Sequence, residues 1–218
     1  MSDVLTRMRI DIVSDAICPW CWIGRANLLA ALEELGWDAE IHWHPYQLNP
    51  DMPRQGVARA EYRTRKFGSL ERSRELDAQV TQAGQAAGVE FRLESQARTP
   101  NTVLAHRLAK LADEQGCQDA MIERMFRGYF QEGQDIGAPE VLAALAREIG
   151  LDGEDFLASD RFEAEVLAED AGWRQMGING VPSFALAGHV LFSGAMPPAQ
   201  MAAAFRQGHA ILQEKGLL

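Results

Sequence analysis

Cysteine is scarce in this chain: among 218 residues, only Cys18, Cys21 and Cys117 carry a thiol. A structural zinc site needs four ligands, and the sequence has no second cysteine pair that could complete one. No apolar run approaches the roughly 18 residues of a membrane-spanning helix, and neither usual glycine-rich phosphate-binding motif is present. These absences argue against a zinc-stabilised fold, a membrane-spanning protein and a nucleotide-binding enzyme.

Positive charge is also in short supply. The chain has 21 Lys and Arg against 31 Asp and Glu, which gives a net charge of −10. Nucleic acid and anionic membrane surfaces are poor partners for such a chain. Residues 1–8 lack the apolar core of a secretory signal peptide, so we expect a cytoplasmic protein. Structural disulfides are rare in that compartment, where a closely spaced cysteine pair is typically catalytic or metal-binding.

Two of the three cysteines form the motif Cys18-Pro19-Trp20-Cys21, which directly follows the apolar segment 10–13. Proline suits the first helical position, so the motif is predicted to open a helix after a strand. There the first sulfur faces unpaired N–H groups and the positive end of the helix dipole, which favour the thiolate. The pKa of such cysteines falls to roughly 3.5 to 7.5. The placement predicts thiol–disulfide exchange rather than an inert pair or half of a zinc site, and it leaves Trp20 exposed between the sulfurs.

Strand patterns occur at the two ends of the chain. We expect strands over residues 9–14 and 39–44, with a helix from Pro19 to about Gly36 between them. This β–α–β order implies a right-handed crossover and two parallel strands. Near the other end, residues 183–186 and 189–192 predict a hairpin that turns at Ala187-Gly188, and a final helix follows Pro197-Pro198.

The middle of the chain is predicted to be helical. Proline and glycine punctuate segments rich in alanine, leucine, glutamate and arginine. The expected helices cover residues 57–66, 69–87, 101–115, 118–131, 138–149 and 160–176. We therefore predict an α/β protein with a discontinuous sheet domain, residues 1–50 and 177–218, and a helical insertion domain, residues 51–176.

Several separated segments resemble one known family. They are Cys18–Cys21 with Ile23-Gly24, Tyr46–Pro50, Arg98–Thr102, Ala105–Leu108, Tyr129–Gly133, Gly180–Phe184 and Ser193–Ala195. Together they resemble the DsbA family of thiol–disulfide oxidoreductases, and its FrnE-like branch in particular, over essentially the full length. The resemblance implies a thioredoxin-like fold of βαβ…ββα order, with a mixed sheet and a large all-α insertion.

The resemblance also implies roles for residues of the motif. Cys18 is expected to be the attacking cysteine and Cys21 the resolving one, with Pro19 and Trp20 bordering the substrate. Val181-Pro182 matches the cis-proline loop of the family. A proline has no N–H, so the backbone of Val181 is left to pair with an extended substrate beside Cys18.

The sequence departs from the family pattern beside the motif. Ala16-Ile17 precede it where an aromatic residue is common, and Trp22 follows it where tyrosine is common. Neither change removes a reactive group.

Other candidate residues have two explanations each. Asn49 starts a turn before Pro50 or borders the substrate site. Asn101 caps a helix and His106 makes a hydrogen bond inside the helical bundle, or both line the cleft that faces Cys18.

Two further features are given structural roles. His42 and His44 share one face of a predicted strand, but no third ligand is near them in the sequence, so no metal site is predicted. Cys117 is expected to be a partly buried or surface cysteine rather than a third redox thiol.

Three functions are compatible with these observations. A thiol–disulfide oxidoreductase or isomerase needs no cofactor, because the two sulfurs carry the electrons; its partners are disulfide- or thiol-containing proteins or small molecules, with glutathione as a candidate redox partner. The alternative is a glutathione-dependent isomerase or transferase of the hydroxychromene-carboxylate isomerase or kappa type, but that branch has serine at the position of Cys18. A holdase-like binding protein with an apolar cleft is the third. The two cysteines favour the first function. A homodimer is a further candidate that no single residue argues for.

Overall fold

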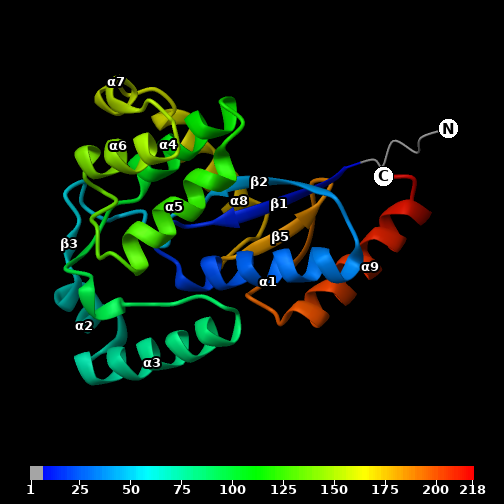
Figure 1. Ribbon diagram of the computed structural model, residues 1–218, viewed down its shortest axis with the longest axis horizontal. Helices are drawn as coiled ribbons and strands as arrows, with labels where there is room; N and C mark the ends of the chain where they lie inside the picture. Colours follow the sequence, from blue (N-terminus) through cyan, green and yellow to red (C-terminus); the bar gives the residue numbers. More distant parts are fainter. Residues whose placement is uncertain (1–6) are drawn as a thin grey trace.

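The computed structural model describes residues 7–218, so residues 1–6 of the N-terminal stretch discussed above lie outside the described residues. The centre of the molecule is a four-stranded mixed sheet with the strand order β2-β1-β5-β6 (Figure 1). The strands are β1 (Met8–Ser14), β2 (Ala39–Pro45), β5 (Ser183–Leu186) and β6 (His189–Ser193). β1 runs parallel to β2 and antiparallel to β5, which forms an antiparallel hairpin with β6. The predicted parallel pair and C-terminal hairpin are confirmed.

Helices cover both faces of the sheet. They are α1 (Pro19–Leu35), α8 (Glu163–Gln175) and α9 (Pro198–Glu214). Ile10 and Ile12 of β1 are fully buried in the main core, where α1 and α9 pack together. Val13 follows Ile12, so its side chain points to the opposite face of the sheet, where it joins a smaller apolar cluster with Trp173 of α8. β1 is therefore buried on both faces of the sheet. The cysteine motif, at the start of α1, follows the end of this buried strand.

The chain between β2 and β5 is mostly helical, as predicted. Its elements are β3 (Val57–Ala58), α2 (Arg59–Phe67), α3 (Leu70–Ala86), a 3-10 turn (Leu93–Ser95), β4 (Arg98–Thr99), α4 (Val103–Glu114), α5 (Gln118–Phe130), α6 (Pro139–Glu148), α7 (Glu154–Ala158) and α8. In Figure 1 the helices from α2 to α7 lie at the end of the molecule away from the C-terminus, with α2 and α3 beside the start of α1. Since α8 also packs against β2, the last helix of the predicted insertion is part of the layer that covers the sheet.

Three details of this region differ from the prediction. Residues 57–58 form β3, which pairs with β4, instead of beginning a helix. The predicted helix over 160–176 begins only at Glu163, because Phe162 has a φ of 66°, a left-handed conformation that cannot be part of an α-helix. α7 was not predicted; five residues are too few for a helical period to be visible in the sequence.

The helical segment is fixed to the sheet through α5. The side-chain amide of Gln118 accepts a hydrogen bond from the backbone N–H of Trp43 at 2.8 Å and donates to its carbonyl oxygen at 3.0 Å. This amide takes the place of a neighbouring strand at the edge of β2. Arg25 of α1 pairs with Asp119 at 2.6 Å and with Glu123 at 2.8 Å. These contacts hold the helices in a fixed position beside the first turn of α1.

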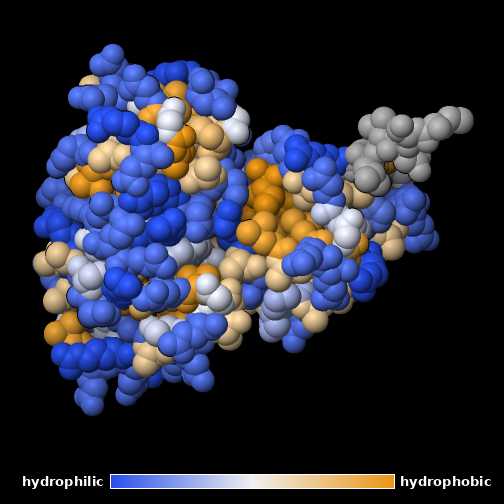
Figure 2. All heavy atoms as spheres, in the orientation of Figure 1, coloured by the Kyte–Doolittle hydropathy of each residue, from blue (hydrophilic) through white to orange (hydrophobic). Residues whose placement is uncertain are grey.

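The surface in this view is mostly hydrophilic over the helical segment, and an apolar patch lies between α5 and α1 over β1 and β2 (Figure 2). None of the helices within residues 7–218 combines the length and apolar character needed to span a membrane.

Candidate active site

The two motif cysteines lie at the start of α1. Cys18 is the N-cap residue, with extended backbone angles, and Pro19 is the first helical residue. The N–H of Cys21 donates to the carbonyl oxygen of Cys18 at 3.0 Å, which closes the first turn. Both side chains are free thiols. The predicted placement of the motif, directly after a strand and at a helix N-terminus, is confirmed.

The two thiols differ in their surroundings. Cys18 is 3% exposed and lines a cavity, whereas Cys21 is fully buried behind it. Burial raises the pKa of the Cys21 thiol well above its ordinary value, and the neighbouring sulfur of Cys18 raises it further. The hydroxyl of Ser14 and the backbone of Asp15 oppose this rise. A molecule in the cavity can therefore reach Cys18, while Cys21 is reachable only through Cys18.

The loop before β5 contacts the first sulfur. The Val181–Pro182 peptide bond is cis, which the sequence alone could not establish. The thiol of Cys18 donates to the carbonyl oxygen of Val181 at 3.6 Å. Within residues 7–218, the N–H of Val181 has no hydrogen-bond partner. The structure thus brings Cys18 and Val181 together and leaves a backbone donor beside them.

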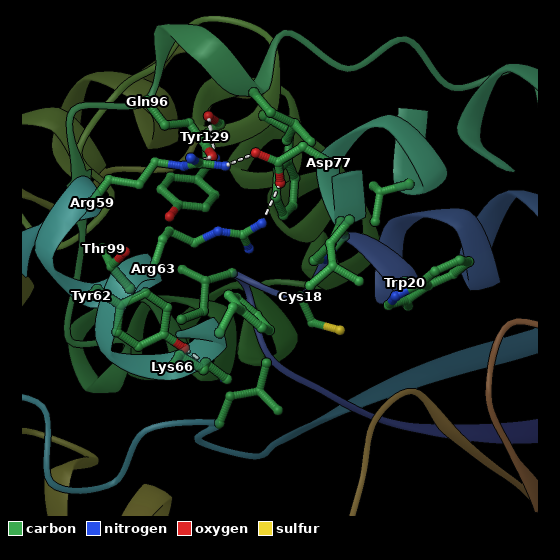
Figure 3. A pocket seen from close by; sticks show the side chains of 18 of the residues that line it. Cys18, Trp20, Arg59, Tyr62, Arg63, Lys66, Asp77, Gln96, Thr99 and Tyr129 are labelled. Atoms are coloured by element: carbon green, nitrogen blue, oxygen red, sulfur yellow. Dashed lines mark hydrogen bonds and ion pairs between the residues drawn. The ribbon is translucent and has the colours of Figure 1, made fainter. Parts of the chain in front are cut away.

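A cavity of about 320 Å³ extends from Cys18 to the helical segment (Figure 3). One side consists of Cys18, Pro19, Trp20 and Val181, and the other of residues from α2 and α3. Trp20 is 40% exposed, as predicted. Much of the lining is apolar; it includes Phe67, Leu76 and Val80 of α2 and α3, together with Ile17, Leu48, Leu93 and Phe130. The volume is at the lower end of the roughly 300–1,000 Å³ typical of small-molecule sites.

Helix α2 contributes basic side chains to this cavity. Arg59, Arg63 and Lys66 line it, at a spacing that places them on one helix face. Asp77 of α3 pairs with Arg59 at 2.9 Å and with Arg63 at 2.5 Å. Burial lowers the pKa of Arg63, and the neighbouring Arg59 lowers it further, whereas Asp77 raises it.

These basic residues are not among the site residues predicted from the sequence. Their spacing of four and then three residues is visible in the sequence, but the same spacing is typical of any solvated helix face. Only the tertiary position of α2 beside α1 shows that they line the cavity next to Cys18.

His106 lies beneath the motif rather than in this cavity. It is 4% exposed, and its Nε2 is 3.4 Å from the carboxylate of Asp15, which is fully buried. Asp15 also accepts a hydrogen bond from the N–H of Leu48 at 2.7 Å. His106 therefore contacts Asp15, three residues before Cys18, and does not line the cavity in front of Cys18.

Asn49 and Asn101 occupy different places. The amide oxygen of Asn49 accepts a hydrogen bond at 2.8 Å from the hydroxyl of Tyr62, which lines the Cys18 cavity. Asn101 accepts from the N–H of Val103 at 3.0 Å and donates to the carbonyl oxygen of Met52 at 2.7 Å. It lines a second cavity, away from Cys18. Asn49 thus supports the wall of the site, and Asn101 acts at the start of α4.

His44 joins the sheet to the helices through ion pairs. Its Nε2 is 2.9 Å from Asp11, and its Nδ1 is 2.5 Å from Glu169, which also pairs with Lys110 at 2.5 Å. His42 lies 3.3 Å from Glu40. Residues 7–218 contain no group of three or more metal-ligating side chains. Both histidines contact carboxylates of neighbouring residues.

Cys117 is half-buried at the N-cap of α5, where burial raises its pKa. Its predicted partial burial is confirmed.

The sequence and the fold are similar to those of known proteins. The family model described as a DSBA-like thioredoxin domain matches residues 9–206. A solved structure of a probable DsbA oxidoreductase from Streptomyces coelicolor is 29% identical, with a TM-score of 0.82, and the match covers 94% of this chain and 91% of that one.

Two further proteins are similar over most of their length. The uncharacterized protein YwbO of Bacillus subtilis is 26% identical over 188 residues, which are 84% of this chain and 89% of that protein. The cytosolic disulfide reductase DsbM of Pseudomonas aeruginosa has a TM-score of 0.64 at 23% identity; 93% of this chain and 99% of that one are covered.

Proposed function

Because this chain belongs to the family of DSBA-like thioredoxin domains, with the α/β fold and helical insertion that the sequence predicts, we propose that it is a thiol–disulfide oxidoreductase. The observation that carries the proposal is the unequal placement of the two sulfurs. Cys18 borders a cavity and the backbone of Val181, whereas Cys21 is fully buried in the first turn of the helix that Cys18 caps. We assign attack to Cys18 and resolution to Cys21.

The reaction proceeds by two exchanges at sulfur. The thiolate of Cys18 attacks one sulfur of a substrate disulfide; a Cys18–substrate disulfide forms, the substrate S–S bond breaks, and the released thiolate takes up a proton. Cys21 then loses its proton and attacks Cys18. The Cys18–Cys21 disulfide forms, and the substrate leaves as a second thiol. Two electrons pass from the protein to the substrate, and the reverse sequence oxidises a dithiol.

The residues around Cys18 orient the substrate in this scheme. The free N–H of Val181 is available to pair with the backbone of an extended substrate, and Trp20 and Pro19 form the adjacent wall. Disulfide- or thiol-containing proteins and small molecules are the proposed partners. No cofactor takes part, because both electrons reside in the sulfurs.

We place the protein in the cytoplasm and assign it the reducing direction. The cytoplasmic glutathione pool keeps a dithiol reduced unless its reduction potential lies below that of the pool. In our proposal Cys18 and Cys21 therefore enter each cycle as two thiols. DsbM of Pseudomonas aeruginosa, which has a similar fold, is a cytosolic disulfide reductase, and this is consistent with the reducing direction. Glutathione is then the candidate that restores the reduced pair.

A glutathione-dependent isomerase or transferase is the second candidate. The small volume of the cavity and its basic wall favour it, because they suit a small anionic thiol. The second cysteine argues against it, since isomerisation needs no resolving thiol and Cys21 lies directly behind Cys18.

Trapping the intermediate separates the two functions. Cys21→Ser is incubated with hydroxyethyl disulfide, and the adduct is located by peptide mass spectrometry. We expect a stable adduct on Cys18 in Cys21→Ser, release of the adduct with closure of the Cys18–Cys21 disulfide only in the wild-type protein, and no adduct at position 18 in Cys18→Ser. An oxidoreductase is excluded if wild type and Cys21→Ser accumulate the same adduct at the same rate and neither releases it.

A further inference from the structure

The cavity beside Cys18 carries a charge opposite to that of the whole chain. Its charged lining residues are Arg59, Arg63, Lys66 and Asp77, a formal excess of two positive charges, although the chain has a net charge of −10. The other lining residues are apolar or neutral. A positive site with low-dielectric walls concentrates anions and repels cations.

The three cations are engaged to different degrees. Arg59 is fixed by Gln96 at 2.9 Å and by Asp77 at 2.9 Å. Arg63 shares the same carboxylate, and its Nε donates to Ser73 at 2.7 Å. Within residues 7–218, its Nη1 has no hydrogen-bond partner.

Lys66 is the least compensated of the three. Its Nζ donates to the hydroxyl of Tyr62 at 2.6 Å, and among the described residues no carboxylate lies within ion-pair distance of it, since Asp77 pairs with Arg59 and Arg63. Tyr62 is held in turn by Asn49. Arg63 and Lys66 therefore present donors that the protein itself leaves unused.

These donors and the reactive sulfur lie on facing sides of one space. In Figure 3, Arg63, Tyr62 and Lys66 project from α2 on one side, and Cys18 and Trp20 come from the start of α1 on the other. Apolar side chains such as Leu48 and Val80 line the space between them. A ligand that reaches both sides has a sulfur at one end, an apolar body and an anion at the other.

We propose, as a deepening of the proposed function on which it rests, that Arg63 and Lys66 bind a carboxylate of a small disulfide substrate while its sulfur lies against Cys18. The chemical class is a low-molecular-weight, carboxylate-bearing disulfide. The cavity volume fits a small molecule of this kind. Arg63 and Lys66 determine specificity: they touch the substrate but not the reacting sulfur atoms.

The test compares disulfides of similar size and different charge. Dithiodiglycolate is anionic, hydroxyethyl disulfide is neutral and cystamine is cationic. The rate of adduct formation on Cys18 is measured in the full chain with the Cys21→Ser change, so that the reaction stops at the mixed disulfide. Lys66→Glu and Arg63→Gln are compared with Arg65→Glu, an exposed change of the same helix outside the cavity. For each protein, the rate with dithiodiglycolate is divided by the rate with cystamine. This ratio for a variant is then divided by the same ratio for its parent, so that leaving-group differences between the probes cancel.

We expect Lys66→Glu to lower this ratio by about three- to tenfold, Arg63→Gln to lower it in the same direction, and Arg65→Glu to change it by less than about twofold. Circular dichroism and the Tm of Lys66→Glu, compared with those of the parent, show whether the variant is folded. The proposal is overturned if Lys66→Glu and Arg65→Glu give the same ratio. If no probe reacts at Cys18 in any protein, the proposed function itself fails, a result distinct from loss of charge selectivity alone.

Discussion

Gly24 allows the Val181–Pro182 loop to lie against α1. A Cβ atom added at Gly24 would lie 2.9 Å from Cγ of Pro182 and 3.1 Å from Cζ of Phe184. Both neighbours are ring atoms held in the core, and Phe184 is fully buried. Gly24→Ala therefore inserts a methyl group where no space exists, on the side of the helix that faces the loop beside Cys18.

The size of the effect follows from two opposing contributions. Alanine stabilises a helix interior by about 0.5–1 kcal/mol relative to glycine. Overpacking of a filled core costs about 1–3 kcal/mol. We expect Gly24→Ala to lower the free energy of unfolding by about 0.5–2 kcal/mol, which corresponds to about 1–8 °C in Tm for a chain of this size.

Gly172 in α8 provides a matched control. It is also a helical glycine, but a Cβ added there meets nothing within 4 Å. Gly172→Ala should raise the free energy of unfolding by up to about 1 kcal/mol.

Urea titration of the two variants, together with the rate of adduct formation on Cys18, measures both consequences. We expect Gly24→Ala alone to slow adduct formation, because the loop that contacts the sulfur must shift. Equal stability of the two variants would refute the packing argument.

Three further changes test the contacts that hold the site in place. Glu169→Gln should lower the free energy of unfolding by about 1.5–3 kcal/mol at neutral pH. Burial raises the pKa of Glu169, but hydrogen bonds from His44 and Lys110 outweigh it and hold the value at about 2. The stabilisation from ionised Glu169 is therefore complete above the ordinary pKa of a glutamate and is lost as pH falls toward 2. The free energies of unfolding of wild type and Glu169→Gln, measured by urea titration, should converge in acid. A difference between them that does not depend on pH would contradict this. Gln118→Ala should cost about 2 kcal/mol or more, because both backbone groups of Trp43 lose their partner, and a Tm equal to that of wild type would show that the edge of β2 needs no such cover. Trp20→Ala should leave Tm within about 2 °C of wild type, because the ring is 40% exposed, and a larger loss would mean that it is a core residue.

Local patterns in the sequence were sufficient for much of the fold. The strand before Cys18, the helix that begins at Pro19 and the hairpin around Ala187-Gly188 are each specified by neighbouring residues, and the structure confirms them. β3 and β4 are only two residues long each, and they pair across forty residues, as Val57 does with Thr99. No local period reveals such a pairing.

The candidate site divides in the same way. Cys18 and Cys21 were identifiable because their chemistry is encoded in their spacing. The basic wall of the cavity was not, because Arg63 and Lys66 acquire their position only when α2 folds back beside α1. Asn101 and His106 matched a motif, but a capping residue and a cleft residue have the same sequence signature, and only the tertiary structure separates them.

The redox equilibrium of the Cys18–Cys21 pair tests the central proposal most directly. The protein is equilibrated in glutathione buffers of graded ratio, the remaining thiols are alkylated, and the mass shift at each cysteine is read by mass spectrometry. We predict a reversible two-electron transition in which alkylation of Cys18 and of Cys21 is lost together, while Cys117 stays alkylated. Cys18→Ser should show no such transition. A pair that never closes, or that accumulates only a stable glutathione adduct on Cys18, would contradict the proposed exchange mechanism.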